Sequence, residues 1–107
     1  EGPQSISKHN NISLKEGMIV SNEPGYYEKN KFGIRIENLI YVKKTKKRKI
    51  FENLTMAPID KELIDKNLLN KKEKDWINSY HRTVFKNLKK DMSDIDLFDL
   101  KFACSAI

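Results

Sequence analysis

The sequence predicts an α+β protein in which antiparallel strands over about residues 18–58 are followed by helices over about residues 59–107. Two observations support this division. Up to Pro58, apolar and β-branched residues occur in short runs separated by turn-forming residues, as is typical of strands. After Pro58, the apolar spacing changes to about 3.6 residues, as in an amphipathic helix. Residues 1–16 are rich in Gly, Pro, Ser and Asn and predict an irregular segment.

Three segments of the first half have the composition of strands. Residues 18–23 form the first, and we expect Pro24 and Gly25 to end it in a turn. Residues 29–31 then predict the tip of a connection. Residues 33–42 are apolar on both faces, which predicts a central strand, and the alternation places Arg35 and Glu37 on one face. Residues 51–58 predict a third strand, closed by its proline.

The second half predicts a helical turn over residues 60–64 and then two helices. Asn70, with Glu73 three residues later, predicts a capping box at the start of a long helix. Its apolar stripe consists of Trp76, Ile77, Tyr80, Val84, Phe85 and Leu88. A last helix is expected to begin near Ser93 or Asp94. Its expected buried side consists of Leu97, Phe98, Phe102 and Ala103.

The chain is basic, with a formal net charge of +6 at neutral pH. Its densest basic run, residues 43–49, lies between two predicted strands, so a solvated hairpin turn is favoured over a nucleic-acid surface. The single Cys104 cannot form an internal disulfide, which is compatible with a reducing compartment. No apolar run approaches the ~20 residues that a membrane span needs.

Two glutamates, Glu23 and Glu37, occur within apolar, strand-like stretches. A carboxylate desolvated in such a place must be paired, protonated or bound to a cation. Hard divalent cations prefer carboxylate oxygens, so a metal site is one reading. A salt bridge with Arg35 is the other, and periodicity alone slightly favours it. We expect His9 to lie on the surface and His81 to pack on a helix flank, so neither is expected to bind a metal.

The strings around both glutamates carry a family resemblance. Residues 14–27 (LKEGMIVSNEPGYY) and 32–38 (FGIRIEN) closely resemble the closing part of Xaa-Pro aminopeptidases, also called aminopeptidase P. Residues 1–7 resemble the segment that follows an active-site histidine in that family. Residues 51–59 and 76–81 resemble the C-terminal extension of its long, eukaryotic-type cytosolic members. The resemblance implies that residues 1–58 are the last part of a pita-bread catalytic domain and residues 59–107 a helical extension.

The resemblance also implies roles for individual residues. Glu23 would be a ligand of one metal ion and Glu37 would bridge two, each ion being Mn²⁺. Arg35 would hold a ligand in orientation, and Tyr27 would lie near the reacting groups, although Tyr26 is close enough to take its place. Gly25 and Gly33 would serve close packing. The family's remaining ligands, two aspartates and a histidine, lie upstream and are not in this sequence.

The implied enzyme removes the N-terminal residue from peptides with proline in second position. We expect this chain to be a C-terminal fragment that is inactive alone and needs the remainder of the catalytic domain. The resemblance implies a cytoplasmic homodimer formed through the extension, with no membrane or nucleic-acid partner. The alternative is a non-catalytic interaction or oligomerisation module that binds an anionic partner through the Lys-rich hairpin.

Overall fold

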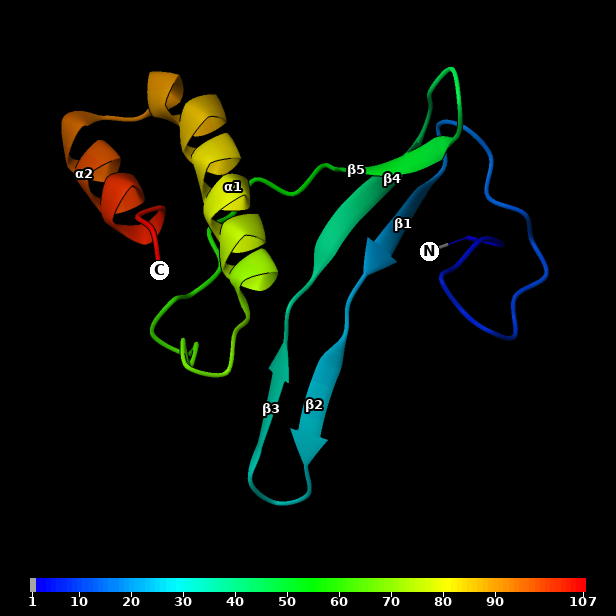
Figure 1. Ribbon diagram of the computed structural model, residues 1–107, viewed down its shortest axis with the longest axis horizontal. Helices are drawn as coiled ribbons and strands as arrows, with labels where there is room; N and C mark the ends of the chain where they lie inside the picture. The colour runs from blue at the N-terminus through cyan, green and yellow to red at the C-terminus, as the bar shows by residue number, and fades with distance from the viewer. Residues whose placement is uncertain (1) are drawn as a thin grey trace. The chain divides into compact units, whose positions relative to one another are not determined.

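The computed structural model describes residues 2–107, which divide into two compact units, one ending at Thr55 and one running from Met56 to Ile107. Figure 1 shows strands in the first unit and helices in the second. This is the predicted α+β composition, and strands and helices occur in the expected order. The elements are β1 (Ile19–Asn22), β2 (Gly25–Glu28), β3 (Phe32–Arg35), β4 (Asn38–Lys44), β5 (Lys49–Asn53), α1 (Lys71–Leu88), a 3₁₀ turn (Lys89–Asp91) and α2 (Asp94–Ala103).

The main sheet of the first unit has three antiparallel strands in the order β1-β4-β5. Strand β4 is central, as its two apolar faces predict. Val20 and Val42 are the buried hydrophobic residues of this sheet, at 4% and 2% exposure. Burying β-branched side chains stabilises strands, so these two valines, which lie on the same face of the sheet, stabilise the pairing of β1 with β4.

Strands β2 and β3 form a separate antiparallel ribbon that continues from β1 and β4 (Figure 1). Its tip is the predicted connection at residues 29–31. There Asn30 has a φ of 60°, which asparagine tolerates better than most residues. The Lys31 amide donates to the Glu28 carbonyl at 3.0 Å and closes the turn.

Two strand predictions were wrong around Pro24. The chain does not turn at Pro24 and Gly25 but continues extended into β2, and among the described glycines only Gly17 has a positive φ. Residues 33–42 are not one strand, because the ladder is interrupted between β3 and β4. Pro24 explains both results, because its ring is compatible with extended backbone while its missing N–H removes one ladder hydrogen bond.

The basic run connects β4 and β5 as a hairpin, as predicted. Its tip is closed by Thr45, whose amide and hydroxyl both donate to the Arg48 carbonyl, at 2.8 and 2.6 Å. Strand β5 begins at Lys49 and ends at Asn53, so it starts earlier and ends earlier than the predicted range of 51–58.

Helix α1 begins with the predicted capping box. The side-chain Oδ1 of Asn70 accepts from the backbone N–H of Glu73 at 3.1 Å. The Glu73 carboxylate in turn accepts from the backbone N–H of Asn70 at 2.8 Å. The apolar stripe buries Ile77, Tyr80 and Val84, whereas Trp76 remains 55% exposed. His81 is fully buried beside them, and its Nε2 accepts from the Ile59 amide at 3.1 Å.

Where a helical turn was expected over residues 60–64, the structure has a single turn, closed by the Ile64 backbone amide donating to the Lys61 carbonyl at 3.2 Å. The Lys61 ammonium reaches the end of α2, where it donates to the Phe102 carbonyl at 2.7 Å. No helix of the described residues is both long and apolar enough to cross a membrane.

Helix α2 begins at Asp94 after the N-cap Ser93, as predicted, and its predicted buried face was right for Leu97 and Ala103 but wrong for Phe98 and Phe102. Leu100 is the buried residue, packing in the core with Tyr80 and Val84. Phe98 and Phe102 are 74% and 66% exposed. The inward stripe instead runs through Leu97, Leu100 and Ala103, a spacing of three residues, with the phenylalanines on the adjacent stripe.

Candidate active site

Both glutamates lie where the two ladders are interrupted. Glu23 follows β1 and Glu37 precedes β4. The ladders on either side of the interruption share one register. Asn22 pairs with Asn38 at the end of the β1–β4 ladder, and Gly25 pairs with Arg35 at the start of the β2–β3 ladder. Extending this register across the gap places Glu23 opposite Glu37. Directly opposed residues of an antiparallel pair point to the same face, so the two carboxylates project together.

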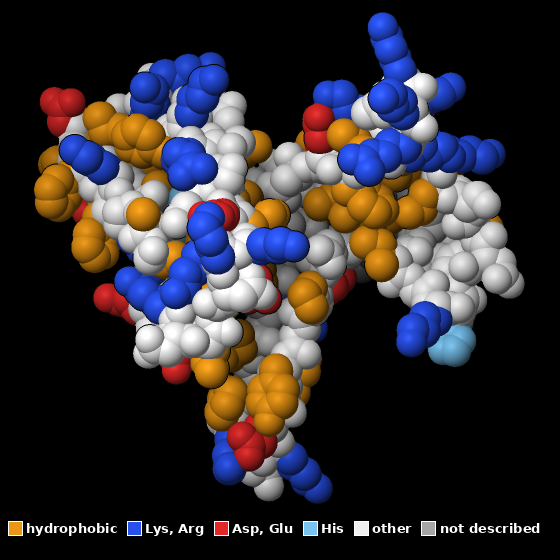
Figure 2. All heavy atoms as spheres, in the orientation of Figure 1, with side chains coloured by type: hydrophobic (Ala, Val, Ile, Leu, Met, Phe, Trp, Pro, Cys, Tyr) orange, Lys and Arg blue, Asp and Glu red, His pale blue; other side chains and the backbone are white. Residues whose placement is uncertain are grey.

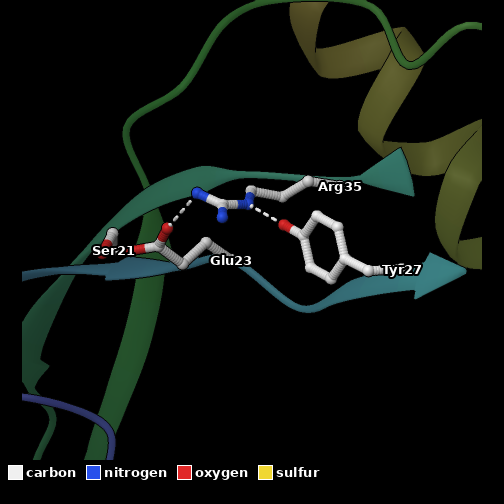
Figure 3. Close-up of polar contacts among 4 residues, drawn as sticks. All are labelled: Ser21, Glu23, Tyr27 and Arg35. Atoms are coloured by element: carbon white, nitrogen blue, oxygen red, sulfur yellow. Dashed lines mark hydrogen bonds and ion pairs between the residues drawn. The ribbon is translucent and has the colours of Figure 1, made fainter. Parts of the chain in front are cut away.

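A polar network on this face holds Glu23 (Figure 3). Arg35 Nη1 donates to Glu23 Oε2 at 2.8 Å, and the hydroxyl of Ser21 donates to Glu23 Oε1 at 2.6 Å. Arg35 Nε also donates to the Tyr27 hydroxyl at 2.8 Å. The salt bridge considered from the sequence is therefore present, and it joins Arg35 to Glu23.

Tyr27, and not its neighbour, reaches the arginine. Tyr26 points to the other face of the ribbon and packs near Phe32, with ring centroids 6.0 Å apart. The Tyr27 ring lies against two glycines. A Cβ on Gly25 would be 2.7 Å from the Tyr27 hydroxyl, and a Cβ on Gly33 would be 2.6 Å from Cδ1 of the ring. The two glycines therefore allow Tyr27 to lie close to the backbone and meet Arg35.

The glutamates are not desolvated in this chain, which corrects the expectation drawn from their apolar surroundings. Both residues are exposed, and the Glu23 side chain is 43% accessible. The physical reason is that the neighbouring apolar side chains, among them Ile34 and Ile36 at 46% each, are themselves exposed. Apolar neighbours in the sequence remove a carboxylate from water only where those neighbours are packed.

The network favours the charged form of Arg35. Its hydrogen bond to Tyr27 contributes most to a raised Arg35 pKa, and the negative charges of Glu23 and, more weakly, Glu37 add to it. Glu37 is thus close enough to act on the same guanidinium. Arg35 is the cation that faces both carboxylates from the ribbon, which offsets part of the repulsion expected between two opposed anions.

A cavity of about 490 Å³ adjoins Glu23. It is lined by Val20, Ser21, Asn22, Glu23 and Pro24 on one side and by Gly2, Gln4, Ser5 and Ile6 on the other. The side-chain Nε2 of Gln4 donates to the Ile19 carbonyl at 3.3 Å and links the two segments. Residues 2–6, far from Glu23 in sequence, therefore form part of the wall beside it.

The donor set suits a hard divalent cation but does not complete a site. Carboxylate oxygens are the ligands such cations prefer, and two opposed carboxylates can serve one pair of ions. Within residues 2–107, however, no three His, Cys, Asp or Glu side chains are grouped as a metal site. His9 is exposed, as predicted, and His81 is buried in the second unit.

Sequence reasoning missed Ser21. Its position two residues before Glu23 places both side chains on one face of a strand, and this was the available signal. A serine in a strand does not by itself indicate a functional role, so only its 2.6 Å contact with Glu23 identifies Ser21 as part of the site.

The class of protein is a metallopeptidase, as two family models show. Residues 50–107 match the C-terminal region of peptidase M24, and residues 1–44 match metallopeptidase family M24. The chain belongs to this family. Within it, the chain corresponds to the C-terminal part of aminopeptidase P, as the following relatives show.

A probable Xaa-Pro aminopeptidase P of Coprinopsis cinerea is 48% identical over 99 residues, covering 82% of this chain and 16% of the relative. Aminopeptidase P2 of Arabidopsis thaliana is 48% identical over 98 residues, covering 82% of this chain and 14% of the relative. The crystal structure of X-prolyl aminopeptidase from Caenorhabditis elegans, described as a cytosolic enzyme with a di-nuclear active site, superposes with a TM-score of 0.76. It is 35% identical, covering 88% of this chain and 17% of that one, and supports the predicted pita-bread fragment. The chain thus spans about one-sixth of the length of these relatives.

Proposed function

We propose that this chain supplies two metal ligands, Glu23 and Glu37, to a di-metal Xaa-Pro aminopeptidase. The proposal rests on the common register of the ladders on either side of the interruption, which, when extended, places Glu23 opposite Glu37, and on the ion pair of Arg35 with Glu23. The relatives support the activity, because they are named as Xaa-Pro aminopeptidases and one has a di-nuclear site. The substrate is a peptide with proline in second position, from which the N-terminal residue is removed.

Each residue then has a distinct role. Glu23 is a ligand of one ion and Glu37 bridges both, and the proposed ions are Mn²⁺. Bound divalent cations supply Lewis acidity toward the peptide carbonyl and lower the pKa of water. Arg35 fixes the orientation of the Glu23 carboxylate, and Tyr27 holds Arg35 in turn. Such supporting residues are typically needed for full metal affinity.

Substitution of Glu37 tests this role in the intact peptidase that contains the chain. Glu37→Ala should abolish Xaa-Pro cleavage and reduce the number of Mn²⁺ ions bound. Glu28→Ala is the matched control, because Glu28 lies on the same ribbon but pairs with Lys31 at 2.5 Å. Full turnover by Glu37→Ala would show that the bridging assignment is wrong.

The isolated chain is proposed to be inactive and to bind Mn²⁺ weakly, because the described residues provide only part of a ligand set. Titration with Mn²⁺ under conditions where the chain is folded checks this. Tight stoichiometric binding, or cleavage of an Xaa-Pro peptide without added protein, would contradict it.

We further propose that residues 1–58 complete the catalytic domain, that residues 59–107 form an extension and that the protein is a cytoplasmic homodimer. The observation favouring a dimer surface on the extension is the exposed apolar face of α2, where Ile95, Phe98 and Phe102 are 79%, 74% and 66% exposed. Phe98→Asp should shift the intact protein toward monomer in sedimentation velocity. An unchanged sedimentation coefficient would exclude this face.

The alternative function, an anion-binding module, is favoured by the β4–β5 hairpin tip. Figure 2 shows Lys and Arg side chains projecting from this hairpin. Lys43 is paired with Glu52 at 2.6 Å, whereas Lys46, Lys47 and Arg48 have no acidic partner among residues 2–107. Salt-dependent retention on nucleic acid that is removed by neutralising these three residues would support this alternative.

A further inference from the structure

The Glu23 carboxylate is held by a different donor at each oxygen. Oε2 accepts from Arg35 at 2.8 Å and Oε1 accepts from the Ser21 hydroxyl at 2.6 Å (Figure 3). A carboxylate oxygen has two lone-pair positions, so each oxygen keeps one for a further partner. Held at both oxygens, the carboxylate cannot rotate about its terminal bond without losing a charge-assisted hydrogen bond.

Ser21 is placed to do this by the sheet rather than by Glu23. It lies within β1, in register with Leu39 of β4, and follows Val20, which is 4% exposed. The ladder and the buried valine therefore fix the Ser21 backbone whether or not its hydroxyl is present. Removing the hydroxyl should change the orientation of Glu23 while leaving β1 in place.

Ser21 and Arg35 contribute different things. Arg35 brings a positive charge, so its removal changes both the orientation and the electrostatic environment of Glu23. Ser21 is neutral, and its removal leaves the formal charge of the site unchanged. An effect of Ser21 on metal affinity would therefore report its hydrogen bond to Glu23 and not a change in formal charge.

We propose that Ser21 is a positioning residue that orients Glu23 toward the metal ions. This inference rests on the proposed function, because it assumes that Glu23 binds a metal. Residues that orient a ligand typically contribute 10- to 100-fold to metal affinity or activity. Because Arg35 still holds the other oxygen in a Ser21 variant, we expect the lower end of that range, roughly 10-fold.

The test uses the intact peptidase and measures free Mn²⁺ by electron paramagnetic resonance during titration, together with kcat and KM. Ser21→Ala should weaken Mn²⁺ binding roughly 10-fold. Ser21→Thr keeps a hydroxyl at the same place and should restore affinity. Ser5→Ala is the matched control, because Ser5 lines the same cavity but its hydroxyl contacts Asn10. Equal melting temperatures exclude a general loss of structure.

Three outcomes separate the inferences. Weakened binding in Ser21→Ala with recovery in Ser21→Thr supports the role. Wild-type affinity in Ser21→Ala, or equal losses in both Ser21 variants, overturns it while leaving the proposed function intact. A wild-type protein that binds no Mn²⁺ refutes the proposed function and the role of Ser21 together.

Discussion

Gly33→Ala should displace Tyr27 from Arg35. The new Cβ would lie 2.6 Å from Cδ1 and 2.9 Å from Cε1 of the Tyr27 ring. Nonbonded carbons need about 3.5 Å, so the ring must move by about 1 Å. A movement of that size along the 2.8 Å bond from Arg35 Nε takes the bond past the ~3.2 Å limit of a good N–H···O contact.

The Arg35 Nε–H signal in a ¹⁵N NMR spectrum of the chain is the direct assay. In Gly33→Ala it should shift toward the position seen in Tyr27→Phe, which removes the acceptor hydroxyl. Gly17→Ala is the control, because Gly17 has a φ of +82° and no atom within 4 Å of an added Cβ. That control should lower stability through backbone strain without moving the Arg35 signal. An unchanged Arg35 signal in Gly33→Ala would refute the idea that Gly33 positions Tyr27.

Four further predictions concern the helical unit. Val84→Ala, at a side chain with no exposed surface, should lower the free energy of unfolding by about 2 kcal/mol in urea denaturation. Asn70→Ala should cost about 1 kcal/mol by removing the α1 cap, whereas exposed Lys72→Ala should cost less than half as much. Burial, and then the charge of Lys61, lower the pKa of His81 below 6.5, so the unfolded chain binds the proton more tightly. The melting temperature should therefore be highest above about pH 6.5 and fall below it, and His81→Gln should flatten that fall. Lys61→Met should speed proteolysis after residue 102, because the ammonium no longer bonds the carbonyl there.

The sequence predicted best those features that local chemistry determines. The Asn70 capping box and the tip at residues 29–31 involve residues within a few positions of one another, and both formed as expected. The inward face of α2 depends on what the helix packs against, and here Leu100 was missed while Phe98 was wrongly assigned to the interior. A turn was wrongly predicted at Pro24, because a proline removes one ladder hydrogen bond without necessarily turning the chain.

The candidate site shows the same division. Strand alternation predicted that Arg35 and Glu37 share a face, and the structure adds the hydrogen bond from Arg35 to Glu23. Burial of the carboxylates was inferred from their apolar neighbours, and it failed because burial depends on packing partners that a local pattern does not specify. The contact of Ser21 with Glu23 required the actual side-chain geometry.

Because the two ladders share one register, the position of Glu23 relative to Glu37 depends on the hairpin formed by β2 and β3 between them. Only the residues between them need to fold for the two carboxylates to meet, so the entropy of closing that loop is small. A single-residue insertion or deletion on one arm between them would turn one carboxylate to the opposite face. Length changes within this ribbon should therefore be tolerated at the solvent-exposed tip around Asn30 and nowhere closer to the glutamates.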